Sequence, residues 1–262
     1  MPKFNKKASK RIRNYKKKPI LFALLLIFIV FLLIINLSDL ISGVLTQSGS
    51  LFIKNKIDVA SYSVYAVSIA DFNNLEEAEE TSYQTKKMGG AGFIYKNGEY
   101  FVLVSSYQTL AEAQEIQQNL LDLGYNSKII NIKCESISKF YKGKNLQNFK
   151  EILLYLKQVY IDLNENNIKL DKNEIDFSKM NSLIAKSITK LINSLKLMQS
   201  FASNFDKELT QIISSNFDQA IKKLNSIFSD GKNDIIFTSK IKDCCINLAL
   251  INSKMNNELN DL

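Results

Sequence analysis

The residues best suited to chemistry are four acidic side chains gathered in one short stretch of the chain. They are Glu76, Glu77, Glu79 and Glu80. Paired carboxylates can serve as the acid and the nucleophile in glycoside hydrolysis. The preceding Asn73-Asn74 is typical of a helix cap, however, and acidic residues in a first helical turn stabilise the helix dipole. We therefore interpret the cluster as the start of a surface helix and not as a catalytic pair.

Other catalytic chemistry finds little support in the composition. The chain has no histidine, so it lacks the usual base for a serine or cysteine nucleophile and the commonest metal ligand. The glycine-rich segment 89–92 lies between a predicted helix and a predicted strand. A phosphate-binding loop needs the opposite order, a strand followed by a helix. We expect a protein that is not an enzyme and has no cofactor and no metal site.

The three cysteines do not form the pattern of a disulfide framework. Cys244 and Cys245 are adjacent, and neighbouring cysteines seldom pair because the geometry is strained. A bridge from Cys134 to one of them remains an alternative. Small buried apolar side chains are the favoured interpretation.

The positive charge of the chain is confined to its first residues. Residues 1–18 hold nine of the 34 lysines and arginines and no acidic residue. The remainder therefore has 34 − 9 = 25 basic residues against 26 acidic ones. A basic domain for nucleic acid is excluded by this distribution, and no nucleic-acid partner is expected.

An uncharged apolar run over residues 20–37 follows this basic tail. As a helix it would span about 27 Å, close to the thickness of the hydrocarbon core of a bilayer. We predict a cytoplasmic tail over 1–18, a transmembrane helix over 19–38 in contact with membrane lipid through residues 20–37, and an extracytoplasmic remainder. A cleaved signal peptide and a buried core helix are the alternatives.

Outside the membrane, the pattern predicts a linker over 39–60 and then a small α+β domain over 61–134. Alternating strand signals and two capped helix starts give the order β-α-β-β-α-β, in which Asn97-Gly98 forms a two-residue hairpin turn. Residues 140–262 show apolar residues at spacings of three and four, and contain no proline. We expect four amphipathic helices there that form a bundle, or an extended helical hairpin that packs on a partner.

Three short stretches of the α+β domain are similar to a known family. The segment from Val67 to Ala78, the strand Tyr100–Tyr107 with the following Leu110-Ala111-Glu112-Ala113, and Leu121–Tyr125 resemble motifs of the SPOR (sporulation-related repeat) domain. The fold class implied is α+β: a transmembrane helix, a ferredoxin-like βαββαβ domain and an all-α carboxyl-terminal region. The resemblance covers about a quarter of the chain and implies binding of peptidoglycan glycan strands at division or sporulation septa.

In that family the glycan lies on the sheet face away from the two helices. The period of two in a strand predicts that Val67, Ile69, Val102 and Val104 point to the helices. The opposite face would then carry the residues expected to bind glycan. These residues are Ser68, Phe101, Leu103 and Ile94. Ile94 belongs to this face because a two-residue turn at Asn97-Gly98 would pair it with Phe101.

Two functions follow from this arrangement. The first is a single-pass membrane protein of the cell envelope that binds peptidoglycan through this sheet face. The second rests on the apolar character of the face, because an exposed apolar surface usually contacts protein. On this alternative the chain is an envelope scaffold whose face is covered by the carboxyl-terminal helices or by an envelope protein partner, without glycan binding.

Overall fold

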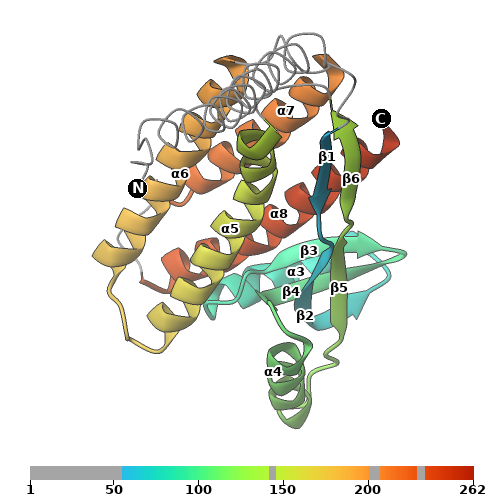
Figure 1. Cartoon of the computed structure of the whole chain (residues 1–262). Coiled ribbons are helices and arrows are strands. Elements are labelled where there is room, and N and C mark those ends of the chain that lie inside the picture. The colour runs from blue at the N-terminus through green and yellow to red at the C-terminus, as the bar shows by residue number, and fades with distance from the viewer. Residues whose placement is uncertain (1–54, 142–145, 201–206, 229–233) are drawn as a thin grey trace, which may run out of the picture. The chain divides into compact units, whose positions relative to one another are not determined.

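A computed structural model of the protein describes residues 55–141, 146–200, 207–228 and 234–262 (Figure 1). The predicted basic tail, the predicted transmembrane helix and residues 39–54 of the predicted linker lie outside these ranges. None of the helices in the described part of the chain is both long and apolar enough to cross a bilayer. The described residues belong to one compact unit that extends to Leu262.

The first half of this unit contains a four-stranded antiparallel sheet and two helices. In chain order the elements are β2 (Tyr62–Phe72), α3 (Leu75–Lys87), β3 (Phe93–Asn97), β4 (Glu99–Tyr107), α4 (Leu110–Asp122) and β5 (Ile129–Cys134). The strands lie in the order β3-β4-β2-β5. The predicted β-α-β-β-α-β sequence of elements is thus confirmed.

Both helices of this half begin with a capped first turn, as predicted. The side chain of Asn74 accepts a hydrogen bond of 2.9 Å from the Glu77 amide at the start of α3. Thr109 and Glu112 form a reciprocal capping box at the start of α4. Gly124 follows α4 with φ = +87°, a conformation that favours glycine. Local sequence therefore sets the starts of both helices and the end of α4.

The strands of a second, two-stranded sheet come directly before and directly after the α+β half in the chain. β1 (Asn55–Val59) pairs antiparallel with β6 (Ile137–Tyr141). β1 occupies the end of the segment predicted as a linker, and β6 begins in the gap between the two predicted domains. β1 alternates between exposed Lys56 and Asp58 and buried Ile57 and Val59, but five residues are a short signal. The partner strand lies about 80 residues away in the sequence, so the pairing depends on contacts between distant segments.

The second half of the unit is helical, as predicted. Its helices are α5 (Leu146–Asp171), α6 (Phe177–Ser200), α7 (Lys207–Asn225) and α8 (Asp234–Asp261). The predicted apolar stripes point into a shared core, in which Phe149, Met180, Phe217 and Leu248 are fully buried. All three cysteines are free and buried, which confirms the favoured interpretation.

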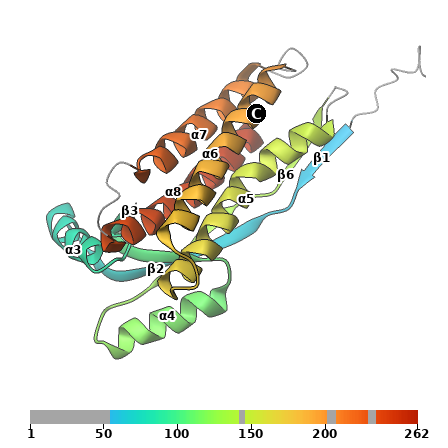
Figure 2. The same cartoon turned by 90° about the vertical axis from the view of Figure 1, so that its left-hand side faces the viewer.

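The four-stranded sheet has a helical layer on each side. α3 and α4 pack on one face, around a small cluster of Ile69, Ala78 and Val102. α8 contacts β4 and β5 on the other side, and Figure 2 shows the sheet between α4 and the helical bundle. Both faces are therefore covered within this single chain.

Candidate functional site

The sheet face predicted to bind glycan is closed. The exposed fractions of the residues are 0% for Ser68, 0% for Leu103 and 8% for Phe101. Phe101 and Leu103 belong to the same continuous apolar core as the buried residues of the four helices α5 to α8. The alternative that the carboxyl-terminal helices cover this face is therefore confirmed.

Ile94 lies on the other face of the sheet, so its predicted position was wrong. β3 and β4 pair with Asn97 opposite Glu99, which places Ile94 opposite Val102 and Tyr95 opposite Phe101. The prediction assumed a two-residue turn, whereas only Gly98 lies between the paired residues, with φ = +74°. A shift of one residue moves every side chain of a strand to the opposite face. Ile94 accordingly packs with the α3 side of the sheet.

Ser68 has its hydroxyl committed to the backbone of the neighbouring strand segment. A register shift interrupts the pairing of β2 with β4 at this residue. Its Oγ accepts a hydrogen bond from the Lys128 amide at 3.1 Å and donates one to the Lys128 carbonyl at 3.2 Å. Ser127 in turn donates to the Ser68 carbonyl at 2.6 Å. The Ser68 side chain therefore satisfies backbone groups at an irregular strand pairing, and its hydroxyl does not face solvent where a ligand could bind.

α8 is held to β5 and the turn after it by a row of polar side chains. Asn256 donates to the Glu135 carbonyl at 2.7 Å, and Asn260 donates to the Ser136 carbonyl at 2.9 Å. Asn252 donates to the Tyr62 hydroxyl. The spacing of four residues places these three asparagines on one face of the helix. Two of the three amides donate to backbone carbonyls, so we interpret the row as a specific contact between α8 and the sheet.

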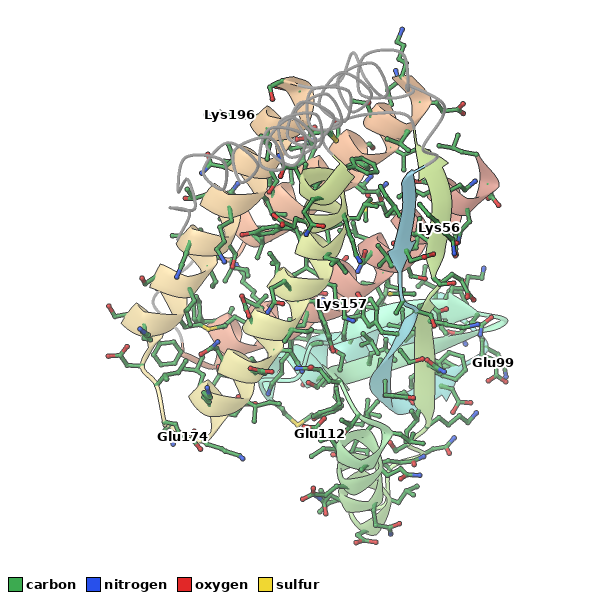
Figure 3. The ribbon with its side chains drawn as sticks, in the orientation of Figure 1. Lys56, Glu99, Glu112, Lys157, Glu174 and Lys196 are labelled. Carbon is green, nitrogen blue, oxygen red and sulfur yellow. The ribbon has the colours of Figure 1, made fainter. Side chains whose placement is uncertain are left out.

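α5 adds a second set of contacts to the same side of the sheet. Tyr160 lies with its hydroxyl 3.5 Å from the Ser106 hydroxyl on β4. Lys157, labelled in Figure 3 on the part of α5 next to the sheet, places its ammonium 4.5 Å from the centre of the Tyr62 ring. Burial raises the pKa of the Tyr62 hydroxyl well above its usual value, so this group stays protonated.

One face of the Phe101 ring is covered by a charged side chain. The Lys128 ammonium lies 5.5 Å from the centre of the Phe101 ring and 2.9 Å from a carboxylate oxygen of Asp71. Asn126 also donates to Asp71, at 2.9 Å. The one aromatic ring that the sequence offered for sugar stacking is therefore part of the shared apolar core, with the ion-paired Lys128 over its ring.

A different surface has the open geometry that the sheet lacks. A cavity of about 550 Å³ lies where the carboxyl-terminal end of α3 meets α7 and α8. We call it the basic cleft. Four lysines and one aspartate line it together with Tyr83, Ile236 and smaller residues; the charged residues are Lys86, Lys87, Lys223, Lys240 and Asp243.

The basic cleft combines positive charge with apolar surface. Tyr83 is 56% exposed and Ile236 is 43% exposed. The Lys87 ammonium lies 4.2 Å from the centre of the Tyr83 ring, and Lys223 forms an ion pair with Asp243. Such a surface suits a ligand that carries both carboxylates or phosphates and an apolar group. Sequence reasoning missed it because its lysines come from three helices that only the tertiary fold brings together.

The turn after α3 forms one wall of the basic cleft. Ser82 donates a hydrogen bond to the Gly92 carbonyl, which draws β3 against α3. Gly92 has φ = +55°, and a Cβ there would lie 2.4 Å from the Ser82 carbonyl oxygen and 2.7 Å from Cγ of Lys86. Glycine is therefore required for the close approach that sets Ala91 and Lys86 at the cleft.

Comparison with known proteins gives one similar structure. No family model matches the chain, and no curated protein matches it. The solved structure is the peptidoglycan-binding domain of the B. subtilis cell wall lytic enzyme CwlC, which is 19% identical over the aligned part. The alignment covers 28% of this chain and 94% of that domain, with a TM-score of 0.24. A likeness this low carries no conclusion about the present chain.

Proposed function

We propose that this chain is a non-enzymatic scaffold protein of the cell envelope, anchored by residues 20–37, in which the sheet holds a helical bundle and the joint surface docks a protein partner. The observation that carries the proposal is the closure of the sheet face by α8. Leu103 is fully buried there, and Asn252 and Asn256 are hydrogen-bonded to the sheet side. A glycan strand could reach this face only if α8 left it.

The closed face also bears on the first function expected from the sequence. Recognition of a sugar needs exposed donors and acceptors beside a stacking ring. Ser68 is committed to Lys128, and Phe101 is covered on both sides. Peptidoglycan binding at a septum stays a prediction, and it would need a surface other than the four residues first expected to form the site.

The test is retention on cell-wall sacculi. The full-length chain in mild detergent is mixed with intact sacculi and with sacculi stripped of stem peptides by an amidase, beside a known peptidoglycan-binding protein. We expect no retention of the chain above the detergent blank on either material. Retention on the amidase-treated sacculi alone would overturn the scaffold proposal in favour of glycan binding. Phe101→Ala would then show whether the sheet face takes part.

A further inference from the structure

The two ends of α3, which is described over its whole length, carry opposite charge and form no ion pair with each other. The nearest charges of the two ends, Glu80 and Lys86, are six positions apart, which is about 9 Å along a helix axis. Among the described residues, no ion pair involves any of the four glutamates at the start of α3. The start of α3, Leu75 to Glu80, is here called the acidic head.

The helix dipole explains the sign of each end but not the full arrangement. It favours acids in the first turn and lysines in the last turn of one helix. It does not explain why Lys223 of α7 and Lys240 of α8 line the same cavity as Lys86 and Lys87. Nor does it explain Leu75, which is 44% exposed beside the glutamates.

The acidic head and the basic cleft are complementary in both charge and polarity. The head offers four exposed carboxylates around one exposed leucine. The cleft offers four lysines around the exposed Tyr83 and Ile236, and one of these lysines, Lys223, is paired with Asp243. Opposite charges steer two surfaces together, and the apolar groups gain from leaving water.

From this complementarity we infer that the acidic head of one copy docks into the basic cleft of a second copy. The contact joins two different surfaces of the same chain, so each bound pair leaves one head and one cleft unoccupied. Such a head-to-tail contact extends into open rows and does not close into a symmetric pair unless the rotation brings the ends together. The inference rests on the proposed scaffold role and names its partner as the chain itself.

Charge reversal tests the contact. Sedimentation velocity of the full-length chain in detergent should show mass that rises with protein concentration and falls at high salt. Lys86→Glu/Lys87→Glu and Glu76→Lys/Glu77→Lys should each weaken the self-association about tenfold or more. Lys179→Glu/Lys186→Glu on α6 makes the same change of charge at exposed positions away from the cleft and should leave it unchanged.

An equimolar mixture of the two reversed variants gives the decisive result. The first variant keeps a native head and the second keeps a native cleft, so the mixture should associate more strongly than either variant does alone. Variants that had merely unfolded could not complement each other in this way. A wild-type chain that stays monomeric at all concentrations, or a mixture that stays monomeric, would overturn the inference. Because this readout needs no cell wall, its failure is distinct from retention on sacculi.

Discussion

Replacing Leu103 with alanine should lower the free energy of unfolding by about 2–5 kcal/mol, because the side chain is fully buried between β4 and the helical core. Urea unfolding of the full-length chain in detergent, followed by far-ultraviolet circular dichroism, measures the change. On an open ligand-binding face, truncation of a leucine would lower the free energy of unfolding much less, because the side chain would already contact water. The size of the effect therefore reports whether the face is closed.

Leu123→Ala is the matched control for this substitution. Leu123 is 73% exposed at the end of α4, so its truncation should change the unfolding free energy by about 0.5 kcal/mol or less. Equal effects of Leu103→Ala and Leu123→Ala would mean that the sheet face is solvated. The helical cover would then have no part in stability.

The double substitution Asn252→Ala/Asn256→Ala should destabilise the unit by about 2–5 kcal/mol. Both asparagines are 2% exposed, and their removal leaves the Tyr62 hydroxyl and the Glu135 carbonyl without these donors. The two sites lie one helical turn apart, so their effects need not add. The same urea titration should show sheet and helices unfolding in one transition at a lower midpoint.

Asn257→Ala provides the comparison within the same helix. Asn257 is adjacent to Asn256 but exposed, so its replacement tests helix propensity without the contact to the sheet. Alanine is the better helix former, and a small stabilisation is expected. If the double variant behaved like Asn257→Ala, the row of asparagines would not hold α8 to the sheet.

Local sequence predicted much of this fold because local interactions determine much of it. Asn74 and Thr109 mark helix starts by their own side-chain chemistry, and each does cap its helix. The apolar spacing from Met180 to Met198 and from Leu209 to Leu224 predicted buried helix faces, and these residues are largely buried. In each case the physical cause lies within a few turns of the same segment.

The errors arose where the answer depends on distant segments or on one residue of register. The Asn97-Gly98 pair correctly marked a hairpin, but the turn is one residue tighter than assumed, which moved Ile94 to the opposite face. The apolar character of the predicted sheet face indicated a covering protein surface, but it did not distinguish the carboxyl-terminal helices from a partner protein. The signal for α8 was present in the spacing of Asn252, Asn256 and Asn260, although asparagines four residues apart do not by themselves name their acceptors.

The basic cleft shows the same division. Lys86 and Lys87 were visible as the last turn of a helix, and the acidic head was correctly assigned to the first turn. Neither assignment could reveal that α7 and α8 bring further lysines to the same cavity. The sequence shows which side chains are charged, but only the tertiary fold shows that lysines from three helices line one cavity.

The accessibility of the native cysteines tests the closed sheet face most directly. Cys134 lies on β5 beneath α8, with its thiol 3.8 Å from the Ala249 carbonyl, and burial raises the pKa of the thiol to about 11. Cys244 and Cys245 are buried within α8 among the helices. Thiol labelling of the full-length chain near pH 8 across a urea series, with each site assigned by mass spectrometry, should find all three cysteines protected together and modified in one transition. Modification of Cys134 without denaturant, while Cys244 and Cys245 stay protected, would show that α8 leaves the sheet and would contradict the account.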